Sequence, residues 1–364
     1  METINGASAK PLRVCLIGTG YMGKCHALAW NAVSATFGDV SRPVLDLLVE
    51  RDDALAATRA TQLGFNRSTS DWKAAVTDPE IDVVSITVPT ALHSEMAVEA
   101  LNAGKHVWCE KPMAKSVEDA TRMSEAATRS KTCAALGYNY IQSPSFRLIL
   151  NAIREGRIGN VHHVRAEMDE DFMADPMSPL FKIYSNPNAG SSFQEFMVHP
   201  LSLVGLLTGE AEEVFAADWT GSGGDHGNAL LKFKNNVSAM ISISRSAWGR
   251  KGRIVLQIYG SEGTVLFDQE RFNEVQIYSV TADSSFQGFT NILSGPDHPP
   301  YDSFVPSPGH GLGFNDLKTI ECYELIRAIS GEAAHIIDFP TGLKIEKTIA
   351  AIEDSSKHRR WTAV

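Results

Sequence analysis

The sequence predicts an α/β protein with two domains: an N-terminal Rossmann domain on a doubly wound parallel sheet, and a C-terminal α+β domain on a large open, mostly antiparallel sheet. Three observations predict this. The 364 residues exceed what one hydrophobic core usually serves. The first third alternates short apolar runs with helical patterns, and after about residue 140 strand-like runs follow one another across short turns. We place the domains at 1–137 and 138–364, and the C-terminal helix could pack back on the first.

Parallel strands are expected in the first domain because helical patterns separate its apolar runs. Leu92, Met96, Ala100 and Leu101 recur at helical spacing between two of these runs. Strands joined by such helices pair in parallel through right-handed crossovers. The expected strands are 13–17, 44–49, 83–88 and 106–109, with a weaker one at 133–137.

The second domain is predicted from strand-like runs separated by turn residues. A helix should begin at Ser143-Pro144 and end at Gly156, and two helices, 316–330 and 341–355, should close the chain. The expected strands are 161–168, 229–233, 237–244, 254–259, 264–267 and 275–280. An open sheet must cover its exposed face, so we expect a homodimer or homotetramer formed through it.

The segment 284–315 is polar and holds five of the sixteen prolines. A loop of this length inside a domain is usually functional or disordered. Its His298, Tyr301 and His310 suit a substrate lid, and a surface excursion is the alternative.

Charge and composition exclude several classes of protein. Lys and Arg number 33 against 43 Asp and Glu, a net charge of −10, which argues against nucleic-acid binding. No run of about 18 apolar residues occurs, so we expect no membrane span. Met1–Gly6 lack the basic and apolar pattern of a secretory signal. Five scattered cysteines suggest reduced thiols and no metal site, so we expect a cytoplasmic protein.

A dinucleotide fingerprint follows the first predicted strand. Gly18, Gly20 and Gly23 form G-x-G-x-x-G between that strand and a helix. Such glycines allow a tight turn, close approach of the pyrophosphate and close helix–strand packing. Glu50, ending the second strand, suits the adenine ribose of NAD, although it lies 32 residues after Gly18 rather than the usual ~20. Arg51 leaves NADP open as the alternative.

The run AGKHVWCEKP at 103–112 carries a resemblance to a known family. With the fingerprint and the later run at 260–263, it resembles the Gfo/Idh/MocA oxidoreductases over nearly the whole chain. Within that family, the runs at 68–72, 174–180 and 295–299 are similar to levoglucosan dehydrogenase-like sugar dehydrogenases, including glycoside 3-dehydrogenases. The resemblance implies NAD as cofactor and a sugar as substrate.

The resemblance also implies catalytic residues, and the chemistry explains them. Oxidation of a carbinol removes a hydride and a proton, so a cation beside the oxygen stabilises the transition state. Lys111 would supply that cation, and His199 would take the proton. Glu195, four residues before His199, replaces the usual Asp. With Ser202 in place of a second Asp and Met197 in place of a small residue, either Glu195 or His199 could be the proton acceptor.

Other positions of the family pattern transfer to this chain as cofactor or substrate contacts. Next to the cofactor the resemblance places a set of residues from four loops: Tyr21, Met22, Pro89, Thr90, His93, Glu110, Lys111 and Asn139. Tyr138 and Asn139 would also face the substrate, together with Lys111, Glu195 and His199.

A cationic cluster at 245–253 suggests a charged substrate. Arg245, Trp248 and Lys251 could line a pocket for an anionic sugar, and a solvated hairpin is the alternative. The leading hypothesis is therefore an NAD-dependent oxidoreductase acting on a ring hydroxyl of a pyranose or glycoside, at C3 for example. A redox-assisted glycoside hydrolase acting on an acidic glycoside such as a sulfosugar, and a non-catalytic NAD-binding sensor, are the alternatives.

Overall fold

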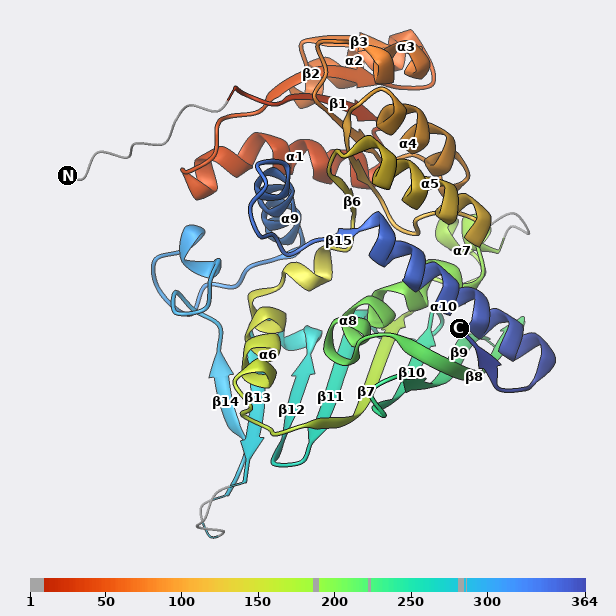
Figure 1. The fold of residues 1–364 in the computed structure, drawn as a ribbon, viewed down its shortest axis with the longest axis vertical. Coiled ribbons are helices and arrows are strands. Elements are labelled where there is room, and N and C mark those ends of the chain that lie inside the picture. Colours follow the sequence, from red (N-terminus) through yellow and green to blue (C-terminus); the bar gives the residue numbers. More distant parts are fainter. Residues whose placement is uncertain (1–9, 186–189, 222–223, 281–284, 286) are drawn as a thin grey trace. The chain divides into compact units, whose positions relative to one another are not determined.

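The computed structural model describes residues 10–185, 190–221, 224–280, 285 and 287–364 (Figure 1). These residues form two compact units. The first contains the described residues up to Gln142 together with Gly313–Leu343, and the second contains Ser143–Leu312 with Lys344–Val364. Met1–Gly6, on which the expectation about a secretory signal rests, lie outside the described residues.

The first unit is built on a seven-stranded sheet with the order β15-β6-β5-β4-β1-β2-β3. All neighbours pair in parallel except β15, which is antiparallel to β6. This is the predicted doubly wound sheet. Its strands are β1 (Arg13–Ile17), β2 (Val44–Val49), β3 (Arg67–Thr69), β4 (Val83–Ile86), β5 (His106–Cys109), β6 (Ala134–Leu136) and β15 (Ile337–Asp338). Its helices are α1 (Tyr21–Phe37), α2 (Asp53–Leu63), α3 (Trp72–Thr77), α4 (His93–Asn102), α5 (Val117–Ser130), α9 (Phe314–Ile329) and the short η1 (Thr90–Leu92) and η2 (Asn139–Gln142).

The division of the chain differs from the predicted boundary at 137/138 in two ways. The first unit continues to Gln142, and Gly313–Leu343 return to it from late in the sequence. The reason is apolar packing: Cys322 and Leu325 of α9 share one buried cluster with Trp30 of α1. Strand β15 then adds to the edge of the same sheet.

The second unit is built on a nine-stranded sheet with the order β14-β13-β12-β11-β7-β10-β9-β8-β16. Its neighbours are antiparallel except β7 and β10, which pair in parallel. The strands are β7 (Val161–Glu170), β8 (Ala211–Gly221), β9 (Gly224–Phe233), β10 (Ser238–Ser244), β11 (Lys251–Gly260), β12 (Gly263–Asp268), β13 (Glu274–Ser279), β14 (Thr290–Leu293) and β16 (Thr362–Ala363). The helices are α6 (Pro144–Arg154), α7 (Pro179–Tyr184), η3 (Phe193–Met197), α8 (Val198–Thr208), η4 (Gln269–Arg271), η6 (Tyr301–Ser303) and most of α10 (Phe339–His358).

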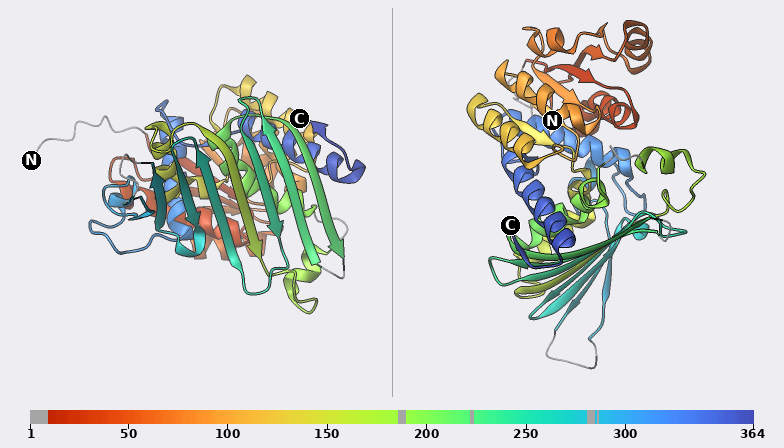
Figure 2. Two further views of the ribbon diagram at one scale, coloured as in Figure 1. Left: turned by 90° about the horizontal axis from the view of Figure 1, so that it is seen from below. Right: turned by 90° about the vertical axis from the view of Figure 1, so that its right-hand side faces the viewer.

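Helices of the second unit cover one face of its sheet. Figure 2 shows α6, α8 and the C-terminal part of α10 on this face, and the opposite face carries no described helix of the unit. The covered face is a buried apolar row that includes Val164, Leu231, Ala239 and Ile258. On the opposite face Leu230 is 44 % exposed. The sheet is therefore open, as predicted.

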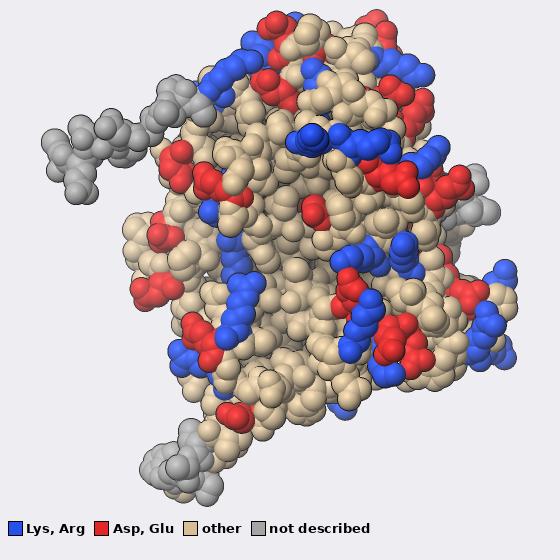
Figure 3. Space-filling model, viewed as in Figure 1, with Lys and Arg blue, Asp and Glu red and all other residues tan. Residues whose placement is uncertain are grey.

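Several elements were not predicted. Strand β8 reads like a helix in the sequence because Ala and Glu are frequent in it. Strand β14 lies inside 284–315, where a loop was expected. No helix among the described residues is long and apolar enough to cross a membrane. On the face shown in Figure 3, Lys and Arg alternate with Asp and Glu, so the charge of −10 does not gather there in a single patch.

Candidate active site

The fingerprint loop joins β1 to α1, and its glycines differ in what surrounds them. Gly18 has φ +88°, and a Cβ there would lie 2.9 Å from the carbonyl oxygen of Thr87. A Cβ on Gly23 would lie 2.1 Å from the carbonyl oxygen of Gly18. A Cβ on Gly20 would meet nothing within 4 Å. Gly18 and Gly23 thus allow close backbone packing, while Gly20 leaves open space at the helix N-terminus, where a pyrophosphate fits.

Glu50 lies at the carboxyl end of β2 and faces the fingerprint loop. Its Oε1 accepts from the backbone N–H of Thr19 at 2.7 Å and from the Thr19 hydroxyl at 2.6 Å, and its Oε2 accepts from the N–H of Arg51 at 3.0 Å. Burial alone would raise the pKa of Glu50, but these hydrogen bonds outweigh it and lower the pKa below its usual value. A carboxylate kept ionised at this edge suits ribose hydroxyls and repels a 2′-phosphate. The Arg51 guanidinium is exposed beside Asp52.

The other predicted cofactor contacts of the first unit divide into exposed and buried residues. Tyr21 is 69 % exposed and stacks on Phe314 with ring centroids 5.8 Å apart. Met22 and Thr90 are half-buried and Pro89 is exposed, so these side chains are available to a ligand. Asn139 is buried, and its Nδ2 makes no hydrogen bond to a described residue. A buried amide donor of this kind is normally satisfied by a partner, and a bound cofactor could supply one.

Glu110 anchors the turn that carries Lys111. The Nζ of Lys318 on α9 donates to Glu110 Oε1 at 2.6 Å, and Nε2 of His26 on α1 lies 2.9 Å from the same oxygen. Glu110 Oε2 accepts from the backbone N–H of Lys111 at 3.3 Å. Burial would raise the pKa of Glu110, but the Lys318 charge and the His26 hydrogen bond hold it far below its usual value. The carboxylate therefore stays ionised and fixes the backbone at Lys111.

Direct contact of Glu110 with the cofactor was predicted and stays a prediction. In the structure its carboxylate contacts Lys318, His26 and the Lys111 backbone. Glu110 is 5 % exposed and Lys318 is fully buried. Sequence reasoning missed Lys318 and His26. One signal was present: Lys318 and Glu321 are oppositely charged and three residues apart on one helix, and they form an ion pair at 2.8 Å.

His93 was predicted to line the cofactor, which stays a prediction; in the structure its ring contacts the turn that carries Lys111. It is 1 % exposed, with Nδ1 3.0 Å from the carbonyl oxygen of Pro112 and Nε2 2.9 Å from that of Val88. Burial lowers its pKa, so the ring is neutral and donates from one nitrogen at a time. When Nδ1 carries the proton, His93 donates to the Pro112 carbonyl oxygen and ties the residue pair Lys111-Pro112 to the start of α4. Lys111 itself is half-buried.

Tyr138 was predicted to face the substrate, and this stays a prediction. Its side chain is fully buried. It lies between β6 and η2, two residues after the last residue of the strand.

Glu195 and His199 lie in the second unit, where the wide turn η3 runs into α8. Glu195 is half-buried and His199 is 9 % exposed. A Cβ on Gly190 would lie 2.7 Å from Glu195 Oε1, so glycine leaves the room this carboxylate occupies. Burial raises the pKa of Tyr184, and the nearby Glu195 charge raises it further. Ser202, which replaces an Asp of the family pattern, donates its hydroxyl to the His199 carbonyl oxygen at 2.7 Å.

The four cations of the cluster at 245–253 form ion pairs with carboxylates. Lys251 pairs with Asp171 at 2.6 Å, and Arg250 pairs with Glu270 at 2.7 Å, both at exposed positions. Arg253 lies among Glu167, Asp169 and Asp268 at 2.9–3.3 Å. Carboxylates of β7, of the residue after it and of 268–270 thus neutralise cations that the sequence analysis grouped with a substrate pocket. Arg245 is the member of the cluster that is buried.

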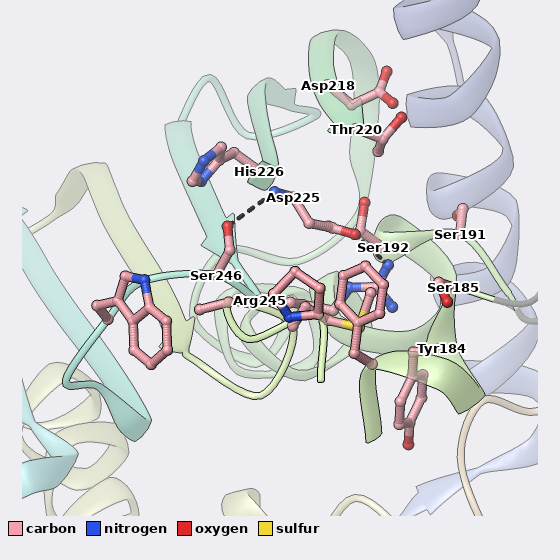
Figure 4. A pocket seen from close by; sticks show the side chains of 15 residues that line it. Tyr184, Ser185, Ser191, Ser192, Asp218, Thr220, Asp225, His226, Arg245 and Ser246 are labelled. Atoms are coloured by element: carbon pink, nitrogen blue, oxygen red, sulfur yellow. Dashed lines mark hydrogen bonds and ion pairs between the residues drawn. The ribbon is translucent and has the colours of Figure 1, made fainter. Parts of the chain in front are cut away.

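Arg245 lines a pocket of about 710 Å³ in the second unit (Figure 4). Its Nη2 donates to Asp225 Oδ2 at 2.6 Å. Ser191 and Ser192, which precede η3, also line the pocket, as does Tyr184. The pocket therefore adjoins the segment that carries Glu195. Trp248 lies at its wall and is 73 % exposed.

The residues proposed for a substrate lid hold their own loop together. Tyr301 is fully buried, and its hydroxyl donates to the His310 carbonyl oxygen and accepts from the His310 N–H. His298 is half-buried and accepts from the N–H of Gly295 at 3.1 Å. The His310 residue is exposed. Tyr301 therefore folds the loop, and a lid remains a prediction only for His298 and His310. Among the described residues no group of three or more His, Cys, Asp or Glu could hold a metal ion.

Comparisons with known proteins give matches along most of the chain. Residues 12–138 match the model of the Gfo/Idh/MocA oxidoreductase family with an NAD-binding Rossmann fold, and residues 146–266 match a C-terminal domain model of that family. Levoglucosan dehydrogenase of Pseudarthrobacter phenanthrenivorans is 32% identical over 97% of this chain and 98% of its own length.

Solved structures give the same result. A levoglucosan dehydrogenase in complex with NADH aligns with a TM-score of 0.93 at 32% identity, covering 98% of this chain and 99% of that one. An NAD-binding oxidoreductase from Klebsiella pneumoniae aligns with a TM-score of 0.91 at 33% identity, covering 97% and 99%. Both likenesses extend over the two units.

Proposed function

The chain belongs to the Gfo/Idh/MocA oxidoreductase family, and from this premise we propose that it is a dehydrogenase that oxidises a ring hydroxyl of a pyranose sugar or glycoside with NAD. One observation carries the proposal. Lys111 follows β5 on an anchored turn, at the same carboxyl edge of a parallel sheet as the fingerprint loop after β1 and Glu50 after β2. Ligands of doubly wound sheets bind at this edge.

The residues present fit NAD. The open space at Gly20 and the helix N-terminus behind it would hold the pyrophosphate, and Glu50 would accept from the adenine ribose. When bound, NAD supplies the acceptor for the hydride. The protein's own residues do the remaining work of holding the sugar, stabilising charge and moving the proton.

Lys111 stabilises the oxygen that becomes alkoxide-like as the hydroxyl proton leaves. A fixed cation is most effective where charge develops, because it needs no reorganisation at the moment of reaction. Glu110, tied to Lys318 and His26, supplies that fixation through the Lys111 backbone. His199 takes the proton, since imidazole titrates near neutrality, and Glu195 orients it or shares this role.

A neutral sugar is a better candidate substrate than the anionic one considered from the sequence. Three of the four cations at 245–253 form ion pairs away from the pocket, and the fourth, Arg245, is neutralised by Asp225. The position of oxidation, C3 for example, follows from the resemblance to glycoside 3-dehydrogenases and needs its own measurement.

The test is NADH formation at 340 nm across neutral sugars, uronic acids and glycosides, with product analysis by NMR to place the carbonyl. The control is the same panel with NADP. Lys111→Ala should lower kcat by at least about 10²-fold, whereas Lys115→Ala, an exposed lysine four residues further on, should not change it.

The same assay can overturn the proposal. Release of free sugar with catalytic NAD and no net NADH would instead establish the redox-assisted glycosidase. Tight NAD binding without turnover of any sugar would instead establish an NAD-binding sensor.

We also propose that copies of the chain associate through the open face of the nine-stranded sheet. The cross-strand row on this face includes Phe215, Leu230 and Met240, which are apolar and at least partly exposed. Sedimentation equilibrium should give a dimer or tetramer, and Leu230→Glu should shift it toward monomer. A monomeric wild-type protein would contradict this.

A further inference from the structure

The pocket of the second unit contains a buried ion pair whose hydrogen-bonding capacity is mostly unused. Arg245 is 4 % exposed and Asp225 is 8 % exposed. Only Nη2 of Arg245 and Oδ2 of Asp225 are joined, at 2.6 Å. Nε and Nη1 of Arg245 and Oδ1 of Asp225 make no hydrogen bond to any described residue.

This arrangement is costly unless something else completes it. Buried polar groups of folded proteins almost always have partners, and each unsatisfied group destabilises the fold. The guanidinium also lies 5.9 Å from the centroid of the Tyr184 ring, which gives it a face contact but no acceptor. In Figure 4 the Arg245 side chain extends toward Ser185 and Ser192. Arg245 and Asp225 both line the pocket, and their unused donors and acceptor lie just behind its surface.

The chemistry of the pair selects the kind of ligand. Arg245 and Asp225 together carry no net charge, so they do not favour an anion over a neutral molecule. They offer two spare donors beside one spare acceptor, a combination that suits hydroxyl groups, which both donate and accept. The rest of the wall agrees with this: its side chains are mainly hydroxylic or aromatic, namely Ser185, Ser191, Ser192, Thr220, Ser246, Phe181, Tyr184 and Trp248.

We propose that this pocket is a second carbohydrate subsite, which binds hydroxyl groups of the part of a glycoside that is not oxidised. The inference rests on the proposed function, because it takes the substrate to be a sugar. Ser191 and Ser192 line the pocket directly before η3, so a sugar held there lies next to the segment carrying Glu195 and His199. The volume of about 710 Å³ is in the range of small-molecule sites.

The test compares monosaccharides with the disaccharides built from them, such as glucose with maltose, cellobiose and trehalose. Asp225→Asn keeps the shape of the side chain but removes the charged acceptor, and Arg245→Gln removes two donors. Each should raise the ratio of disaccharide KM to monosaccharide KM at least tenfold. Arg250→Gln is the matched control, because that arginine lies in the same loop but pairs with Glu270 at an exposed position, and it should leave the ratio unchanged.

A variant that fails to fold would not decide the question, so a third substitution is included. Trp248→Ala removes an aromatic wall that is 73 % exposed, so the fold should tolerate it, and it should raise the same ratio. Equal changes in KM for monosaccharide and disaccharide in all three variants would overturn the subsite and leave the proposed dehydrogenase standing.

Binding separates this inference from the proposed function. Calorimetric titration of maltose, cellobiose and trehalose into the protein with NADH present measures the subsite even if no sugar is oxidised. Binding of one of them that weakens at least tenfold in Asp225→Asn but not in Arg250→Gln supports the subsite. Wild-type protein that binds none of them, or binds a uronic acid in their place, overturns it.

Discussion

Two buried charge clusters in this chain use their hydrogen-bonding groups very differently. In the first unit, Glu110 accepts from Lys318 and His26 and also from the Lys111 backbone. In the second unit, Arg245 and Asp225 share one hydrogen bond and leave three polar atoms without partners. The first cluster holds backbone in place through the groups that donate to Glu110, whereas the unused groups of the second belong to residues that line a pocket. The two clusters should therefore respond differently to substitution, the first through stability and the second through affinity.

The largest expected effect is on stability, in Lys318→Met. Removal of this fully buried ammonium leaves Glu110 ionised without its cation, which costs about 3–5 kcal/mol of unfolding free energy. Urea denaturation followed by circular dichroism measures it. The double substitution Lys318→Met with Glu110→Gln should recover part of the loss, because the side chain at 110 then carries no charge. Lys344→Met, at an exposed lysine, is the control and should not move the midpoint.

A Lys318→Met protein as stable as wild type would show that water reaches Glu110. The expectation that the Glu110 cluster acts through stability would then be wrong.

The second effect is a pH dependence that comes from Glu321. Burial raises the pKa of Glu321 from 4.5 to about 7, despite the Lys318 charge that lowers it. The folded state thus binds a proton more tightly than the unfolded state. Stability from this group is present below pH 4.5 and is lost as the pH rises to about 7, by up to about 3 kcal/mol.

Glu321→Gln, a permanently uncharged side chain, tests this directly. Its unfolding free energy should change less than that of wild type between pH 5 and pH 7.5, and the variant should be relatively more stable at the upper end. Parallel profiles for the two proteins would assign the ionised state to Glu321 throughout and remove it as a source of pH dependence.

A smaller effect, on kcat, is expected for a substitution at Gly190. A Cβ there would lie 2.7 Å from Glu195 Oε1, and this carboxylate is the end of a flexible side chain, so it can move aside. Gly190→Ala should therefore lower kcat several-fold with little loss of stability. Gly205→Ala on α8, where a Cβ meets nothing within 4 Å, should leave kcat unchanged and add about 0.5–1 kcal/mol of stability. Unchanged kcat in both variants would argue that Glu195 has no part in the reaction.

The sequence predicts local elements better than their long-range packing, for a physical reason. Fingerprint glycines and apolar parallel strands are local patterns, so β1, β2, β4 and β5 could be located from them. Long-range packing is not local, and the return of α9 to the first unit depends on an apolar face that any core could bury. The pairing of β7 with β10 in parallel is likewise set by sheet assembly and not by a turn.

In the candidate site, too, residues in local motifs were predicted and residues placed by long-range packing were missed. The EKP motif at 110–112 located Lys111, but Lys318, 207 residues later, lies on a helix whose position the sequence could not give. The cluster at 245–253 suggested a surplus of charge because the carboxylates that neutralise it come from other strands and loops. Which cation faces a pocket could be decided only once β7, β10 and β11 were placed.

The smallest effect is expected at Lys251, which the sequence grouped with Arg245. Lys251 is exposed and pairs with Asp171, and the Asp171 carboxyl has its pKa lowered by that hydrogen bond. Exposed pairs contribute little, because water and salt screen them. Lys251→Gln should therefore leave KM within about twofold for neutral and anionic sugars alike. Steady-state kinetics at low and at 0.15 M salt measures this. A KM that rises tenfold for a uronic acid alone would contradict this expectation. Lys251 would then contact the substrate, and the anionic-sugar hypothesis would be restored.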